Sequence, residues 1–204
     1  MKLFLTVILA VFVVHAIPAW ADGGDHPLQG YPEVQGKLWK KKSYADSRGK
    51  NLVILTHTGI YASKPNADPD SICSNGDLYA YGYTNDGAVP PTLSWRMHDY
   101  VHECETSTRA DFSQDSPVIT DLDGNGISEV WITYYIGCHG DVSPDGMKIL
   151  MYEGNKKYAL RGETFVHVDG MDQGGKYTAD PAFSSAPAAF RQFADKLWQK
   201  NMRP

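Results

Sequence analysis

The chain has 204 residues, of which 42% are hydrophobic, 12% aromatic and 21% charged. That apolar share is enough to build a hydrophobic core, which excludes a wholly disordered chain. Nineteen Lys and Arg against 24 Asp and Glu give a net charge of −5, and this acidic balance argues against a nucleic-acid partner, which needs a basic surface. The length predicts a single domain, or at most a domain with a small appendage.

Residues 1–21 have the pattern of a secretory signal peptide. Lys2 supplies a positive charge, and 11 of the 12 residues from Leu3 to Val14 are apolar. Small residues flank Trp20 at the two positions that a signal peptidase reads, so we expect cleavage before Asp22. The apolar run is shorter than the roughly 20 residues that a membrane span needs. We therefore expect a periplasmic or secreted protein with no membrane span after cleavage.

Export makes a disulfide possible, because oxidising compartments preserve it. Cys73, Cys104 and Cys138 allow three pairings. We favour Cys104–Cys138, and closing a loop of their 34-residue separation is worth roughly 3–4 kcal/mol. Cys73 would then be a spare thiol.

The remaining chain is predicted to be β-rich. We assign residues 22–49 to a flexible N-terminal lead-in and residues 50–204 to one domain, with a long Pro, Asp and Ser-rich loop over 62–76. The segment 93–104 fits both a helical and a strand period, and its β neighbours favour a strand. Alternating or β-branched runs predict further strands at 52–56, 78–83, 117–120, 130–135, 147–152 and 157–160, the last two forming a hairpin.

Only the C-terminal segment 186–201 has a clear helical period. Ser185 can cap its start and Pro187 suits its first turn. The sequence thus predicts a mainly β fold of antiparallel sheets with a C-terminal amphipathic helix that docks on a sheet, and α+β as the alternative. The apolar face of the helix consists of Phe190, Phe193, Ala194, Leu197 and Trp198.

The segment 121–129 carries oxygen side chains at alternate positions, as a calcium loop does. Calcium binds six to eight oxygens at about 2.3–2.6 Å, and Gly126 permits the sharp turn that lets a short loop supply them. A plain hairpin turn is the alternative, but three carboxylates within nine residues would repel one another without a cation. The predicted ligands are Asp121, Asp123, Asn125, the carbonyl of Ile127 and Glu129.

The spacing of this loop is not that of an EF-hand, because the twelfth position is Ile132 rather than Glu. A carboxylate at the ninth position between two strands resembles the calcium loops of integrin α-subunit propeller repeats (FG-GAP type). The loop occurs once in the chain, so the sequence gives no repeat that would indicate a complete propeller. We expect a structural ion with an affinity of about 10⁻⁴–10⁻³ M.

A wider pattern surrounds this loop and consists of Leu78 to Tyr81, Trp95, Asp99, Cys104, the loop, Tyr135, Cys138, Asp141 to Pro144 and Lys157 to Gly162. This pattern resembles an uncharacterised family of small exported bacterial proteins, some of which are labelled as surface polysaccharide biosynthesis proteins. The match covers about residues 50–162 and supports the Cys104–Cys138 pairing, since both cysteines lie inside it. It implies little about activity.

Catalytic signals are weak. His102-Glu103 begins like a zinc-protease helix, but Thr106 stands where the second His is needed. His98 and His102 would lie about 13 Å apart along a strand, so we interpret them as surface histidines. Nucleophile elbows and phosphate-binding glycine loops are absent from the sequence.

Trp39, within a Lys-rich run, and Trp95 are candidates for a ligand surface, with a buried aromatic core as the alternative. We expect a non-enzymatic binding or structural module of the bacterial cell envelope that engages polysaccharide or another envelope protein. The competing hypothesis is an envelope glycan hydrolase that uses a carboxylate pair not identifiable from the sequence.

Overall fold

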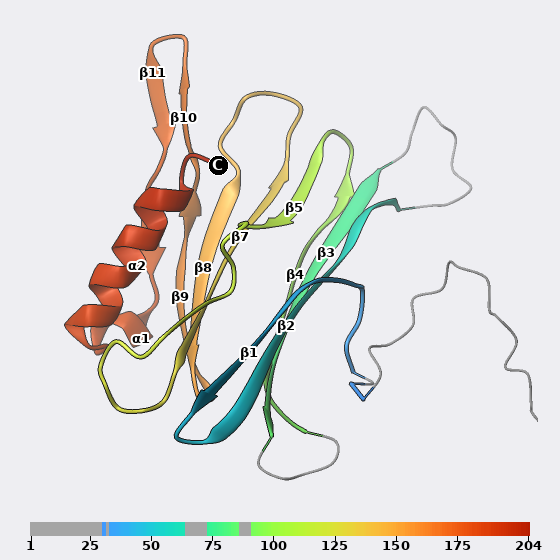
Figure 1. The fold of residues 1–204 in the computed structure, drawn as a ribbon. Coiled ribbons are helices and arrows are strands. Elements are labelled where there is room, and N and C mark those ends of the chain that lie inside the picture. The colour runs from blue at the N-terminus through green and yellow to red at the C-terminus, as the bar shows by residue number, and fades with distance from the viewer. Residues whose placement is uncertain (1–29, 32, 64–72, 86–90) are drawn as a thin grey trace, which may run out of the picture.

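The computed structural model describes residues 30–31, 33–63, 73–85 and 91–204. The predicted signal peptide, most of the predicted lead-in before residue 37 and much of the 62–76 loop lie outside these residues. Two sheets, a hairpin and two helices make up the described part (Figure 1). The prediction of a mainly β, antiparallel fold with a C-terminal helix is confirmed.

The first sheet has four antiparallel strands in the order β1-β2-β3-β4. The segment 93–104, which fitted two periods, is a strand. The four strands are β1 (Lys37–Asp46), β2 (Gly49–Ala62), β3 (Ser74–Asn85) and β4 (Thr92–Cys104).

The second sheet is also antiparallel, in the order β12-β9-β8-β7-β5, with the short β6 paired to β7. The predicted 147–160 hairpin is confirmed as β8 and β9. The strands of this sheet are β5 (Thr108–Phe112), β6 (Val118–Thr120), β7 (Glu129–Cys138), β8 (Gly146–Glu153), β9 (Lys156–Glu163) and β12 (Tyr177–Ala179). A separate hairpin pairs β10 (Phe165–Val168) with β11 (Met171–Gly174).

The two sheets pack on each other through their apolar faces. One core cluster joins Leu55 and Leu78 of the first sheet to Ile132 and Leu150 of the second, all at most 2% exposed. Trp95 belongs to this cluster, and its ring stacks on Tyr152 with centroids 4.1 Å apart. Because Trp95 is 9% exposed, its assignment to a ligand surface was wrong, and the alternative of a core aromatic holds.

The C-terminal helix covers the other face of the second sheet (Figure 1). Helix α2 (Ala188–Asn201) packs Phe190 and Trp198 on Trp131 and Met151 in a second core cluster, as its apolar face predicted. Within the described residues, neither helix is long and apolar enough to cross a bilayer.

The start of the helix differs from the prediction. Residues 181–184 form a short helix, α1 (Pro181–Ser184), and Ser185 is the C-cap of α1 rather than the N-cap of the next helix. The N-cap of α2 is Pro187, which makes no side-chain capping hydrogen bond. Helix α1 was not predicted from the sequence, and its N-cap Asp180 accepts a hydrogen bond from the amide of Phe183.

The lead-in assignment also needs correction, because residues 37–46 form strand β1. A shift of register between Leu38 and Lys40 breaks the two-residue alternation, and the following lysines hide the apolar positions. Trp39 and Tyr44 pack against the inter-sheet core. Lysines are common on such edge strands because their charge discourages pairing with other chains.

The disulfide Cys104–Cys138 is confirmed, with Cα atoms 5.6 Å apart. It joins the end of β4 to the end of β7 and therefore links the two sheets covalently. Cys73 is a free, half-buried thiol.

We expect the double substitution Cys104→Ser, Cys138→Ser to lower the free energy of unfolding by about 3–4 kcal/mol, because the unfolded chain gains the freedom that the 34-residue loop denies it. Urea denaturation at pH 7 measures the change. The matched control Cys73→Ser should stay within about 0.5 kcal/mol of the original. Equal stability of the double variant and this control would contradict a structural role for the bond.

Candidate metal centre

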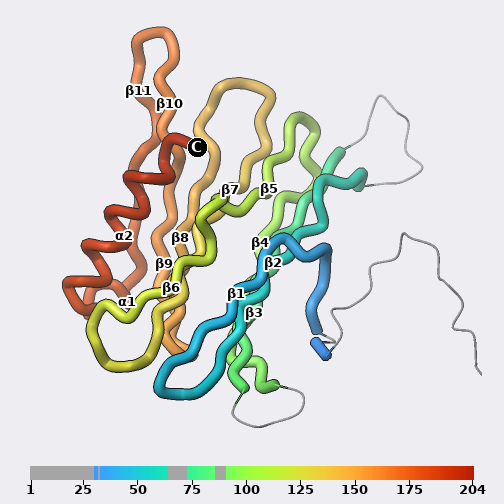
Figure 2. Tube along the Cα trace, viewed as in Figure 1, coloured from blue at the N-terminus to red at the C-terminus, as the bar shows by residue number. Residues whose placement is uncertain are grey.

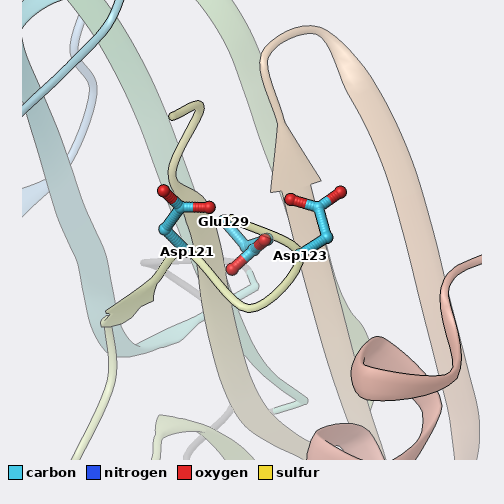
Figure 3. Close-up of side chains that lie close together, drawn as sticks. All are labelled: Asp121, Asp123 and Glu129. Carbon is cyan, nitrogen blue, oxygen red and sulfur yellow. The ribbon is translucent and has the colours of Figure 1, made fainter. Parts of the chain in front are cut away.

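The loop between β6 and β7 gathers three carboxylates. Asp121 and Asp123 lie in the loop, and Glu129 is the first residue of β7, paired with Thr120 of β6. Each carboxylate offers an oxygen, and these oxygens lie within 4.8 Å of one another. Figure 3 shows the three side chains turned toward a common region rather than splayed apart.

Backbone geometry winds this loop tightly. Gly124 and Gly126 have φ values of 69° and 79°, in the left-handed region that glycine adopts at little cost. The amide of Gly126 donates to a carboxylate oxygen of Asp121 at 3.1 Å, and the amide of Asn125 donates to Asp123 at 3.2 Å. The glycines therefore let the chain curl back over its own acidic side chains.

Glu129 is the buried member of the cluster, at 0% exposure, whereas Asp121 and Asp123 are exposed. Its carboxylate accepts the hydroxyl of Thr120 at 2.6 Å and the amide of Leu122 at 3.0 Å. Burial raises the pKa of Glu129, and the negative charges of Asp123 and Asp121 raise it further. The ionised form is therefore disfavoured in the absence of a cation, which is the electrostatic setting of a cation site.

The loop is tied to the first sheet. The amide of Ser47, in the turn between β1 and β2, donates to the carbonyl of Gly126 at 2.8 Å. The amide of Ser128 donates to Asp46 at 3.2 Å, and Asp46 also receives the guanidinium of Arg48 at 2.9 Å. Figure 2 shows the tip of the β1–β2 hairpin beside this loop. Order in the loop is thus coupled to order in both sheets.

The other two predicted ligands are placed differently. The side-chain NH₂ of Asn125 donates to Asp123 at 3.1 Å and to Glu153 at 2.6 Å, and its oxygen accepts the amide of Ile127 at 2.7 Å. The Asn125 oxygen is therefore engaged within the loop, and the recorded hydrogen bond of Ile127 is made by its amide, not by its carbonyl. The structure brings together the acidic members of the predicted set.

Glu153 is an acidic neighbour that the sequence analysis missed. It ends β8 and lies directly opposite Glu129 in the β7–β8 pair. The predicted 147–152 strand ends one residue earlier, but nothing in the sequence fixes its register against β7. Among the described residues of the loop, Glu153 contacts only Asn125, whose side-chain NH₂ donates to it.

Trp39 lies apart from this centre, at a hollow of about 500 Å³ between β1, β5 and the end of α2. Its indole packs against Phe112 with centroids 5.3 Å apart, and the ammonium group of Lys40 lies 4.5 Å from the ring centroid. The polar side chains that also line the hollow are Arg109, Asp111, Ser113, Gln114, Asp115, Lys200 and Asn201.

Glu129→Gln should stabilise the protein in chelator at pH 7 by about 1 kcal/mol, the scale of repulsion between close charges in a water-like dielectric. The substitution removes a buried charge while its remaining oxygen can still accept the amide of Leu122. Because the pKa of Glu129 is raised, the penalty exists only above that pKa, so the gain should vanish in acid.

Urea unfolding in EDTA measures this gain, with exposed Glu105→Gln as the matched control. A variant less stable than the original at pH 7 would show that Glu129 serves the fold as an anion without any cation.

Comparisons with protein-family models, with curated proteins and with solved structures found no match for this chain. The resemblance to an exported bacterial family and to integrin-type calcium loops therefore stays a prediction.

Proposed function

We propose that the protein is a calcium-binding module, exported to the bacterial cell envelope, in which residues 121–129 hold the ion in a structural role. The observation that carries this proposal is the convergence of Asp121, Asp123 and fully buried Glu129 within 4.8 Å. All three donors are carboxylate oxygens, the ligands that hard cations such as calcium prefer.

An ion at this position would stabilise more than its own loop. Ser47 and Asp46 bind the loop backbone from the first sheet, and Glu129 begins β7, an interior strand of the second. Neutralising the acidic cluster would therefore stabilise the contact between the two sheets at this loop. The coupling to the fold supports a structural rather than a catalytic ion.

Calcium at 10 mM should raise the stability of the protein by about 1.4–2.7 kcal/mol for dissociation constants of about 10⁻³–10⁻⁴ M. For a chain of this size the melting temperature should rise by roughly 3–10 °C relative to chelator. Asp123→Ala removes one carboxylate, so the melting temperature of this variant should differ by less than about 1 °C between calcium and chelator.

Thermal melting followed by circular dichroism measures both proteins. Asp111→Ala, an exposed aspartate outside the loop, is the matched control and should keep the full calcium response. Equal melting of the original protein in calcium and in chelator would remove the metal hypothesis.

For the ligand of the module, we propose a sugar chain of the envelope seated in the hollow beside Trp39. The hollow combines the half-buried indole of Trp39 with charged and amide side chains that can pair with sugar hydroxyls. Its size lies in the range of ligand pockets, about 300–1,000 Å³.

Two carboxylates, Asp111 and Asp115, also line the hollow, and they are the candidates for the pair that the hydrolase hypothesis requires. A glycosidase needs one carboxylic acid with a raised pKa. The ammonium group of Lys200 instead lowers the pKa of Asp115, and the guanidinium of Arg109 lies 3.5 Å from Asp111. Both carboxylates are more than half exposed. This pairing favours a binding module over a hydrolase.

Affinity electrophoresis through gels containing purified neutral or acidic envelope polysaccharides tests the ligand proposal. At least one polysaccharide should retard the protein, and Trp39→Ala should weaken that binding at least tenfold, about 1.4 kcal/mol. Tyr100→Ala, which removes an exposed aromatic side chain outside the hollow, is the control. Unchanged retardation of Trp39→Ala would place the ligand elsewhere, and release of new reducing ends would favour the hydrolase.

A further inference from the structure

A second cluster of potential ligands lies on the face of the first sheet that points away from the second. Asp77 of β3 is paired with Tyr100 of β4, so His98 and His102 flank it from the neighbouring strand. Nε2 of His98 lies 2.7 Å from Oδ1 of Asp77, and Nε2 of His102 lies 3.2 Å from the same oxygen. Two imidazoles therefore converge on one carboxylate.

The burial of these groups is uneven. The side chain of Asp77 is 5% exposed, whereas those of His98 and His102 are 44% and 40% exposed. The third side chain on the carboxylate is Tyr61, whose hydroxyl donates to Oδ2 at 2.8 Å. These three partners give the buried carboxylate its hydrogen bonds. Buried anions are normally paired with a cation or coordinated to a metal.

The backbone on both strands holds this arrangement. The amide of Asp77 donates to the hydroxyl of Thr58 on β2 at 2.9 Å. Glu103, directly after His102, has a φ of 55°, and its amide is held by the side-chain oxygen of Asn75 at 2.8 Å. Left-handed backbone at a residue other than glycine is strained and is often found at functional sites. Cys104 then fixes the strand end through the disulfide.

We propose that Asp77, His98 and His102 form a binding site for a divalent transition metal of the zinc class. Two imidazole nitrogens and one carboxylate oxygen are a donor set suited to zinc, and calcium disfavours the nitrogens. Three protein ligands leave a fourth position, which the exposure of the two rings opens to water or a ligand. The hydroxyl of Tyr61 would orient the carboxylate from its second oxygen, as outer hydrogen bonds do at metal sites.

Binding requires a local rearrangement. The two Nε2 atoms lie within about 6 Å of each other, since both contact Oδ1 of Asp77. The three donors are nevertheless more widely spread than the 4.8 Å that encloses the acidic cluster of Asp121. Tetrahedral zinc at about 2.0–2.1 Å from each nitrogen would bring them to about 3.4 Å. His98 stacks on Tyr79 with ring centroids 4.5 Å apart, and His102 stacks on Tyr100 at 4.2 Å, so inward rotation of the imidazoles must shift these stacks. Each ring moves its proton to Nδ1 as Nε2 becomes a ligand.

This site is independent of the calcium proposal, because it shares no residue with the loop and uses a different donor set. Strand geometry alone spaces His98 and His102 about 13 Å apart, so the sequence predicts two separate surface histidines. The β3–β4 register, which the sequence does not fix, sets Asp77 between them.

Isothermal titration with ZnCl₂ at pH 7, in 10 mM CaCl₂ to saturate the acidic loop, tests the proposal. One equivalent of zinc should bind, and His98→Gln and His102→Gln should each weaken binding at least tenfold. His167→Gln is the matched control, because this exposed histidine also pairs with an aspartate, Asp172, but in the β10–β11 hairpin. Asp77→Asn should also lose the site, with circular dichroism checking that it folds.

Cobalt provides a second measurement that a merely structural role of the histidines would not produce. Co²⁺ bound to the original protein should show the visible absorption of a four-coordinate nitrogen and oxygen site, and His98→Gln should abolish it. The proposal is overturned if zinc does not bind at one equivalent. It is also overturned if binding survives both histidine substitutions, or disappears instead in His139→Gln or Asp123→Ala.

Discussion

The central constraint on this molecule is a carboxylate with no exposed surface, Glu129, at the first position of β7, an interior strand of the second sheet. The pairing of β7 with β6 fixes the position of Glu129 opposite Thr120. Its carboxylate accepts hydrogen bonds from the hydroxyl of Thr120 and the amide of Leu122. Two more carboxylates then close over it from the loop. Burying one anion under two others is costly unless a cation joins them. The stability of the β6–β7 hairpin therefore depends on how the charges of the loop are neutralised.

The two halves of the fold meet at a few specific connections besides their shared core. At one of them the β1–β2 turn hydrogen-bonds the loop at Gly126 and Ser128, and at another the disulfide joins Cys104 to Cys138. Between them, the ammonium group of Lys148 on the second sheet pairs with Asp99 on the first at 2.6 Å. The packed apolar faces provide the bulk of the stabilisation, while these polar and covalent links fix how the sheets lie on each other.

Much of the fold could be predicted from the sequence because its signals are local. The apolar runs of β7, β8 and β9 and the helical period of α2 each lie within one segment. Strand β1 was missed since a bulge and three consecutive lysines mask its alternation. Strands β5, β10, β11 and β12 were missed because each has at most five residues and lacks the continuous β-branched run that marks β6. Short strands carry too little period to be distinguished from loops.

The candidate sites follow the same division. The acidic loop could be predicted because Asp121, Asp123 and Glu129 are close in sequence, so a tight turn is enough to bring them together. Glu153, and the grouping of Asp77 with His98 and His102, depend on which residue of one strand faces which residue of the next. Register of that kind is a property of the packed sheet rather than of any single segment.

The two clusters also differ in what their chemistry selects. The loop offers carboxylate oxygens alone, which suits a hard cation with many ligands and flexible geometry. The outer face of β3 and β4 offers two imidazoles beside one carboxylate, which suits a smaller set of ligands and a softer ion. Because the donor types differ, the two ions would not compete strongly for each other's place. One chain could then hold a structural cation at the sheet junction and keep a second, solvent-facing metal position for a ligand.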